Sequence, residues 1–205
     1  MNISPYSLLS IFSPLLSIIA GWKRKGSLIW VYAVCAIIFD VFTSIYLKRV
    51  LLVNSQWSAN LFVLVEFLLI SFYYKERIFP GSVLFYLIVI SFSVFFVTTT
   101  WQYSIFVFNL FGASFFCLAY IVYTIYAFYL MLQRKEILFL HRSSFFWVNV
   151  AFLIYSSGTF LLFLSKDYLI STDAHFFMRL WSIVFVSLNI AKHIFLALGL
   201  SKKTP

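Results

Sequence analysis

Three ionisable residues, Asp40, Glu66 and Lys192, lie well inside long apolar stretches of this sequence. A charged side chain at the centre of a membrane-spanning helix costs ~2.5–3.5 kcal/mol on insertion scales. Such residues are expected to pair, to face a wet cavity or to carry a function. Asn189 lies three residues before Lys192 and four before His193, so these three side chains share one face of a helix.

Depth in the membrane indicates which of these charges can meet. A helix rises ~1.5 Å per residue, which places Asp40 and Glu66 at similar depths, ~10 and ~12 Å from one edge of the apolar layer. Lys192 is expected ~6–8 Å deeper in a core ~30 Å thick, and a lysine side chain can cover that gap. We therefore expect an ion pair between Glu66 and Lys192, either structural or functional. Alternatively, the two acids share a proton.

Other polar residues recur at helical spacing near these charges. Asn149, Ser156 and Thr159 form a stripe at steps of seven and three, and Tyr73 follows Glu66 by seven residues. Such a stripe either lines a polar interior or bonds neighbouring helices, as Ser, Thr and Asn often do in membranes. For His193 the structural role is favoured. The predicted intramembrane polar site comprises Asp40, Glu66, Lys192, Asn189 and Asn149, with Tyr73, Ser156 and His193 in support.

Composition indicates the solvent in which this chain folds. Of its 205 residues, 63% are hydrophobic and only 10% are charged, and the mean hydropathy is +1.00. Soluble domains carry roughly 25% charged residues, and one soluble core of this size cannot hide so much apolar surface. The sequence therefore predicts an all-α, polytopic transmembrane helix bundle formed by a single domain, residues 1–205.

About seven apolar stretches approach the ~20 residues that cross a bilayer as a helix. The first is followed, not preceded, by basic residues, which argues against a secretory signal peptide. The spans are predicted at residues 5–22, 28–47, 58–74, 82–99, 104–132, 144–164 and 175–200.

Basic residues between the spans predict the orientation. Ten of them fall in the loops after the first, third and fifth spans and in the tail, against four on the opposite side. The richer side is expected to be cytoplasmic, with the N-terminus outside and the C-terminus in the cytoplasm. The net charge of +9 is thus a topology signal, and no nucleic-acid partner is expected. The ten residues are Lys23, Arg24, Lys25, Lys75, Arg77, Arg134, Lys135, Arg142, Lys202 and Lys203.

No residue set predicts an enzyme, a cofactor or a metal site. Cys35 and Cys117 lie inside apolar stretches, and the three histidines are scattered. The loops are too short for a soluble domain, so the expected partners are the lipid bilayer and another protein in the membrane or the cytoplasm.

Three segments resemble a family of small, functionally uncharacterised seven-helix bacterial membrane proteins. They are NLFVLVE at 60–66, FWVNVAFLIYSSGTFLLF at 146–163 and LNIAKHIFLALGL at 188–200. Similar regions precede histidine-kinase domains in some bacterial sensors. The resemblance implies a multi-pass protein of the bacterial inner membrane that acts as a sensor or an accessory protein. Because this sequence contains no kinase part, we expect a separate partner.

Two other functions follow from the same charges. A small proton-coupled transporter would use Glu66, Asp40 and Lys192 as its relay. A lysine in the last span facing an acid in the third also resembles retinal-binding proteins, in which the lysine carries the Schiff base. This sequence departs from the microbial pattern, because Leu188 stands where an Asp is expected and the sixth span lacks Trp-x-x-Tyr-Pro. The retinal alternative is therefore remote.

Overall fold

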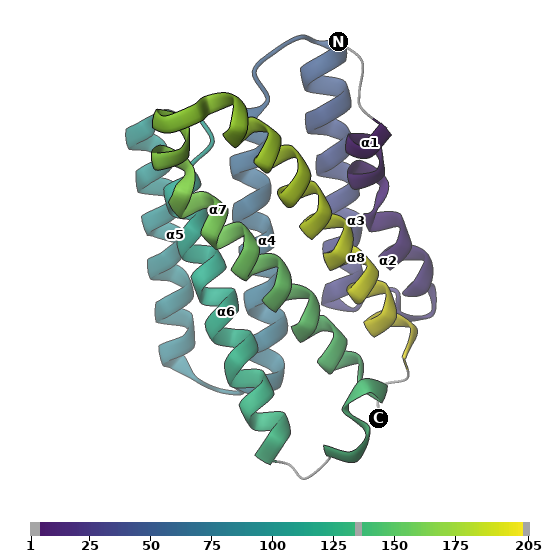
Figure 1. Ribbon diagram of the computed structural model, residues 1–205. Coiled ribbons are helices and arrows are strands. Elements are labelled where there is room, and N and C mark those ends of the chain that lie inside the picture. Colours follow the sequence, from purple (N-terminus) through teal and green to yellow (C-terminus); the bar gives the residue numbers. More distant parts are fainter. Residues whose placement is uncertain (1–4, 134–136, 203–205) are drawn as a thin grey trace.

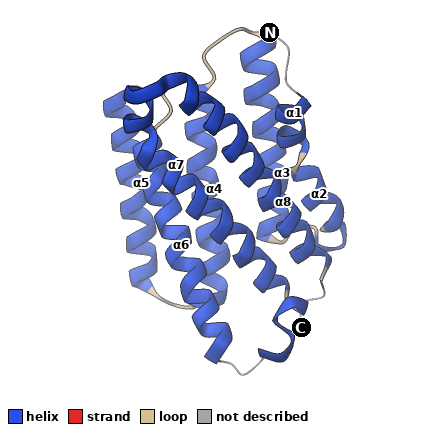
Figure 2. Cartoon of the chain, in the orientation of Figure 1, coloured by secondary structure: helices blue, strands red, loops and turns tan. Residues whose placement is uncertain are grey.

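The computed structural model describes residues 5–133 and 137–202, which are helical and contain no strand (Figures 1 and 2). The all-α class is thereby confirmed. Two segments, η2 and η4, are π-helical and continue directly from α3 and α7. The elements are α1 (Pro5–Phe12), α2 (Pro14–Ala20), η1 (Trp22–Arg24), α3 (Leu28–Val41), η2 (Phe42–Val50), α4 (Gln56–Ile78), α5 (Val83–Tyr103), α6 (Leu110–Gln133), η3 (Ile137–Arg142), α7 (Ser144–Leu180), η4 (Trp181–Phe185) and α8 (Val186–Ser201).

Six helical stretches are long and apolar enough to cross a membrane, as expected of a multi-pass membrane protein. The apolar helix at Tyr6–Ala20 is shorter than these six. It is divided at Ser13, whose hydroxyl donates to the Ser10 carbonyl at 2.8 Å. The six longer stretches are Leu28–Val50, Gln56–Ile78, Val83–Tyr103, Leu110–Gln133, Ser144–Lys166 and Tyr168–Ser201.

The predicted fifth span begins too early. Residues 104–109 form a loop, and α6 starts at Leu110 because Asn109 caps it: the Asn109 side-chain oxygen accepts from the Gly112 N–H at 2.8 Å. The Asn109 amide also donates to the Thr99 and Thr100 hydroxyls, both at 2.8 Å. One asparagine thus joins the end of α5 to the start of α6, and apolar length alone could not reveal that bend.

The prediction of a loop between the last two spans, at residues 165–174, is also wrong. The chain stays helical from Ser144 to Leu180, except for Asp173, whose φ of −155° and ψ of 97° are not helical. The Asp173 carboxyl accepts from the Phe176 N–H at 2.9 Å, which caps the helix that restarts there. The chain therefore turns over one end of the bundle with only Asp173 outside helical geometry, and α8 descends beside α7 (Figure 1).

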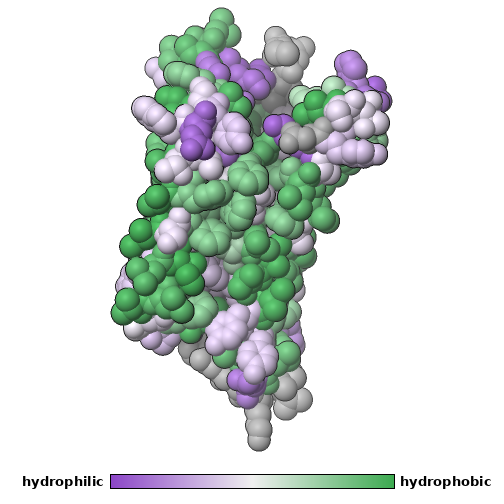
Figure 3. Space-filling model, turned by 90° about the vertical axis from the view of Figure 1, so that its left-hand side faces the viewer, coloured by the Kyte–Doolittle hydropathy of each residue, from purple (hydrophilic) through white to green (hydrophobic). Residues whose placement is uncertain are grey.

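The helices surround a central space. α2, α3, α4, α6, α7 and α8 each pack against the next, and α8 closes the ring on α2. α5 lies outside the ring, against α4 and α6 (Figure 1). Hydrophobic residues cover the flank of the molecule, and hydrophilic residues gather towards its two ends (Figure 3). This surface matches a bundle that faces lipid along its sides.

Tight packing is concentrated at one end of the ring. We call this end the closed half; it comprises residues 28–36, 66–78, 116–127, 144–155 and 192–200, and the opposite end is the open half. Phe67 and Phe116 stack there with ring centroids 3.9 Å apart. Of the largest fully buried side chains, only Thr159 lies outside the closed half; the others are Tyr32, Tyr74, Phe67, Phe152, Ile29, Ile70, Leu196, His193, Val148, Asn149 and Thr124.

Candidate functional site

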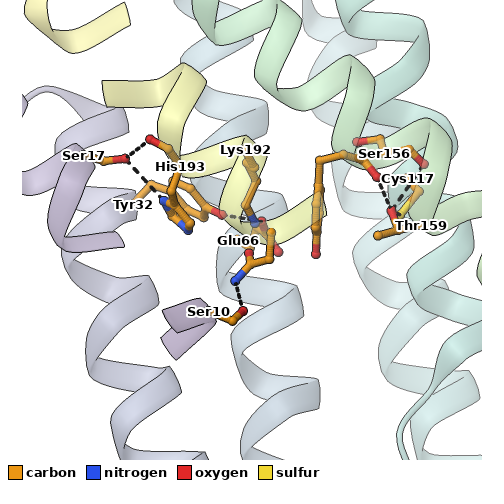
Figure 4. A network of polar contacts seen from close by, with 11 residues as sticks. Ser10, Ser17, Tyr32, Glu66, Cys117, Ser156, Thr159, Lys192 and His193 are labelled. Atoms are coloured by element: carbon orange, nitrogen blue, oxygen red, sulfur yellow. Dashed lines mark hydrogen bonds and ion pairs between the residues drawn. The ribbon is translucent and has the colours of Figure 1, made fainter. Parts of the chain in front are cut away.

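The predicted contact between Glu66 of α4 and Lys192 of α8 is confirmed (Figure 4). Lys192 Nζ lies 3.4 Å from Glu66 Oε1, and the two side chains are only 2% and 7% exposed. The Tyr32 hydroxyl donates to the same carboxyl oxygen at 2.7 Å. Lys192 Nζ also lies 3.8 Å from the centroid of the Tyr155 ring, a cation–π distance. The two buried charges therefore satisfy each other with support from two tyrosines, as a low-dielectric site requires.

The residues beside Lys192 attach α8 to the short N-terminal helices. The Ser17 hydroxyl donates to the His193 carbonyl at 3.0 Å and lies 3.3 Å from its ring Nδ1. The His193 ring stacks on Tyr32 with centroids 6.2 Å apart. One turn earlier, the Asn189 amide donates to the Ser10 hydroxyl at 3.0 Å. These contacts agree with the structural role predicted for His193.

A partly open cavity of about 420 Å³ extends from the edge of the closed half into the open half, between α3, α4, α6, α7 and α8. The Glu66–Lys192 pair lies at its deep end, and its mouth lies near the exposed side chains of Gln56 and Met178. Aromatic side chains form a large part of the wall. The aromatic lining residues away from the ion pair are Phe39, Phe62, Phe108, Phe116, Phe163, Phe177, Trp181 and Phe185.

Asp40 faces the same cavity from α3. Within residues 5–133 and 137–202, no side chain or backbone group forms a hydrogen bond or ion pair with its half-buried carboxyl. The two π-helical segments lie close by: η2 contributes Thr43 and Ser44 to the lining, and η4 contributes Trp181 and Phe185. π-Helical turns occur frequently at functional sites. Asp40 is thus a carboxyl that no hydrogen bond or ion pair from the described residues satisfies, in an irregular part of the bundle.

Asn149 and Tyr73 are not part of this cavity, contrary to the prediction. Asn149 lies in the closed half, where it accepts from the Tyr74 hydroxyl at 2.9 Å and donates to the Phe145 carbonyl at 2.7 Å. It is six residues from Tyr155, or ~9 Å along α7 from the level of the ion pair. Tyr73 lies ~10 Å beyond Glu66 along α4, and the Arg77 guanidinium carbon is 4.6 Å from its ring centroid.

Ser156 is likewise buried away from the cavity lining. Its hydroxyl has no hydrogen-bond partner among the described residues. It follows Tyr155 directly, and one helical step turns a side chain by ~100°. Thr159 connects helices as predicted, because its hydroxyl lies 3.4 Å from Cys117 Sγ of α6 (Figure 4).

The sequence interpretation missed Tyr32 and Tyr155, which complete the ion pair. Tyr32, Ala36 and Asp40 follow the i, i+4, i+8 spacing of one helical face, and all three line the cavity. That spacing could have indicated Tyr32, because a tyrosine buried in an apolar helix usually needs a hydrogen-bond partner. Tyr155 stands among many aromatic residues in its span, and no pattern distinguishes it.

Within the described residues, the site combines aromatic walls, one satisfied ion pair and one carboxyl that forms neither a hydrogen bond nor an ion pair. Such a surface can bind a molecule that has an apolar body and a polar group. No group of His, Cys, Asp and Glu side chains that could hold a metal ion occurs in the described part of the chain. Comparisons of the chain with models of known protein families, with curated proteins and with solved structures gave no match.

Proposed function

We propose that this chain is an integral membrane sensor or accessory protein that binds a small amphipathic molecule within its helix bundle and acts through a protein partner. The cavity of about 420 Å³ that ends on the Glu66–Lys192 pair carries this proposal. Small-molecule pockets typically measure ~300–1,000 Å³ and combine apolar walls with a few polar groups. The cavity has that size and that lining.

Filling the cavity tests the binding function. Ala59 lines the cavity, whereas Ala197 of α8 does not, and both are half-buried. We expect wild-type protein extracted in polymer-bounded native membrane discs to carry a bound small molecule that mass spectrometry detects. Ala59→Phe should lose that molecule and Ala197→Phe should keep it. A wild-type protein without any bound molecule, or equal retention by Ala59→Phe, would count against a binding function.

The partner requires a separate experiment. Affinity purification in mild detergent should recover one specific protein with the wild-type chain. The amount recovered should change in Ala59→Phe and not in Ala197→Phe, because the cavity is proposed to control the partner. A chain that stays solitary under every mild condition would contradict this part of the proposal.

The proposed location is the bacterial inner membrane, with seven crossings, the N-terminus outside and the C-terminus in the cytoplasm. The distribution of basic residues supports this orientation. The start of α1 and the end of α8 lie at opposite ends of the bundle, which suits an odd number of crossings that includes Tyr6–Ala20 (Figure 1). A reporter fused at Pro205 should be active in the cytoplasm, and one fused near Gln102 only outside. The reverse pair of results would overturn the orientation.

Proton-coupled transport is the second candidate, because Asp40 and Glu66 line one cavity together with Lys192. Transport would also require a second conformation that opens the closed half, where Tyr32 and Tyr74 are fully buried. Proton flux in proteoliposomes distinguishes the two functions. Transport requires flux in the wild type that Glu66→Gln abolishes, whereas equal background flux in both rules it out.

A further inference from the structure

The charges that line the cavity do not balance. Its carboxyl, lysine and histidine side chains are Asp40, Glu66, Lys192 and His193. Glu66 and Lys192 neutralise each other across 3.4 Å. His193 is bound to Ser17 and stacked on Tyr32. Asp40 is the one of these acids that forms no ion pair or hydrogen bond among the described residues, and Lys192 acts on it only from beyond ion-pair distance. With two acids and one lysine, the empty cavity carries one surplus negative charge when the Asp40 carboxyl is ionised.

An unpaired carboxylate is unfavourable inside a bundle surrounded by lipid, because little water is present to solvate it. A cation that entered the cavity would remove this penalty. The surroundings of Asp40 suit a cation as well, since Phe39, Phe62, Trp181 and Phe185 line the same space. Aromatic faces attract ammonium groups, most strongly where water is excluded.

The shape of the site indicates where the rest of such a molecule lies. Asp40 follows Tyr32 by eight residues along α3, so it lies ~12 Å from the level of Tyr32, in the direction of the mouth. The walls on the mouth side include Phe163, Phe177 and Trp181. An ammonium group at Asp40 would therefore leave an apolar body against these rings.

We propose, building on the binding function above, that the cavity selects a lipophilic monocation. Its ammonium group pairs with the Asp40 carboxylate, and its apolar body packs against the aromatic wall. The charge of the whole chain sharpens this inference. At a net +9 the protein repels cations in general, so a preference for a cation reports the local charge at Asp40.

Three probes with one chain length test the ligand class: octylammonium, octanol and octanoate. Each is titrated into the full chain in nanodiscs of zwitterionic lipid, and binding is followed by the shift in thermal unfolding. We expect octylammonium to bind at least ~10-fold more tightly than octanol, which is the effect of one charge-assisted contact. Octanoate should bind most weakly. This selectivity in the wild type needs no variant.

Two variants locate the selectivity. Asp40→Asn keeps the shape of the side chain and removes its charge, and we expect it to weaken octylammonium roughly 10-fold and leave octanol unchanged. Glu76→Gln is the matched control, because Glu76 is an exposed acid near the end of α4, outside the cavity. It should bind all three probes as the wild type does.

The outcomes separate this inference from the function on which it rests. Octanol or octanoate could bind as tightly as octylammonium, with Ala59→Phe abolishing the binding. That result would support the binding function of the cavity and overturn its preference for a cation. Octylammonium binding that survives Asp40→Asn unchanged also overturns it. If no probe binds and the extracted wild-type protein carries no small molecule, the binding function itself fails.

Discussion

The closed half and the open half of the bundle treat polar groups differently. In the closed half, Asn149 is bonded to Tyr74 and Glu66 is bonded to Tyr32. Towards the open half the same helices enclose a cavity, and Asp40 faces it without a hydrogen bond or ion pair in the described chain. The ion pair between Glu66 and Lys192 lies at the boundary between the two. We infer that one end of the ring provides stability and the other leaves room for a ligand.

The two halves also differ in how closely the helices approach. In the closed half, a Cβ atom at Gly199 would lie 3.1 Å from the Ser144 carbonyl oxygen, so α8 rests almost directly on the start of α7. In the open half, aromatic side chains separate the helices; Trp181, for example, stacks between Phe163 and Phe185.

The ion pair at the boundary should give the largest effect on stability. Lys192→Met or Glu66→Leu alone leaves a buried charge unpaired, and we expect each to lower the free energy of unfolding in detergent by ~3–5 kcal/mol. The double variant should recover much of this loss, with a coupling energy of ~1–3 kcal/mol. Denaturation of the wild type, the two single variants and the double variant measures this coupling energy. Strictly additive effects would show that the pair does not join the two halves.

The second-largest difference in stability is expected when a small residue is replaced by phenylalanine in each half. Ala151 is fully buried in the closed half, so Ala151→Phe should cost ~1–3 kcal/mol or more through overpacking. Ala59 faces the cavity, and Ala59→Phe should stay within ~0.5 kcal/mol of the wild type. Thermal unfolding of both variants gives the comparison. Equal losses would mean that the open half is packed as tightly as the closed half.

Removing a charged or hydroxyl group should have opposite signs in the two halves. Tyr32→Phe deletes a hydrogen bond to a buried carboxylate and should destabilise the protein by ~1–2 kcal/mol. Asp40→Asn removes an unpaired carboxylate and should stabilise the unliganded protein by ~1 kcal/mol. Melting temperatures without ligand test both signs. A destabilised Asp40→Asn would indicate that Asp40 has a stabilising partner after all.

The smallest expected difference in stability between the two halves comes from substituting one glycine in each. At Gly158 a Cβ would meet a terminal methyl of Leu188, a flexible side chain that can move aside. Gly158→Ala should therefore be neutral or gain up to ~1 kcal/mol from helix propensity. At Gly199 the obstacle includes backbone, so Gly199→Ala should lose about 0.5 kcal/mol or more despite that gain. Chemical denaturation curves can resolve this difference, and identical behaviour would remove the packing contrast.

Tertiary structure decided which predicted residues share a site. Asp40, Glu66, Asn189 and Lys192 line one cavity, whereas Asn149 points into the closed half. Spacing along one helix tells which side chains share a face. It does not tell how each helix is rotated or shifted against its neighbours, and that depends on packing among all of them. Helical spacing places Tyr32 on the face of Asp40, but its hydrogen bond to Glu66 depends on how α3 meets α4.

The sequence by itself determined the helical class, the multi-pass arrangement and the pair of opposite charges at depths that a lysine side chain can bridge. These follow from local properties, because apolar length sets what crosses lipid and a buried charge must find a partner. Of the seven predicted spans, six correspond to helices long and apolar enough to cross a membrane, and the first corresponds to the shorter helix Tyr6–Ala20. Only the tertiary structure decided the bend at Asn109, the turn at Asp173 and the cavity. Each of these arises where segments distant in sequence meet or where a side chain caps a helix, and the free energy of such contacts depends on the relative placement of whole helices, which local hydropathy does not encode.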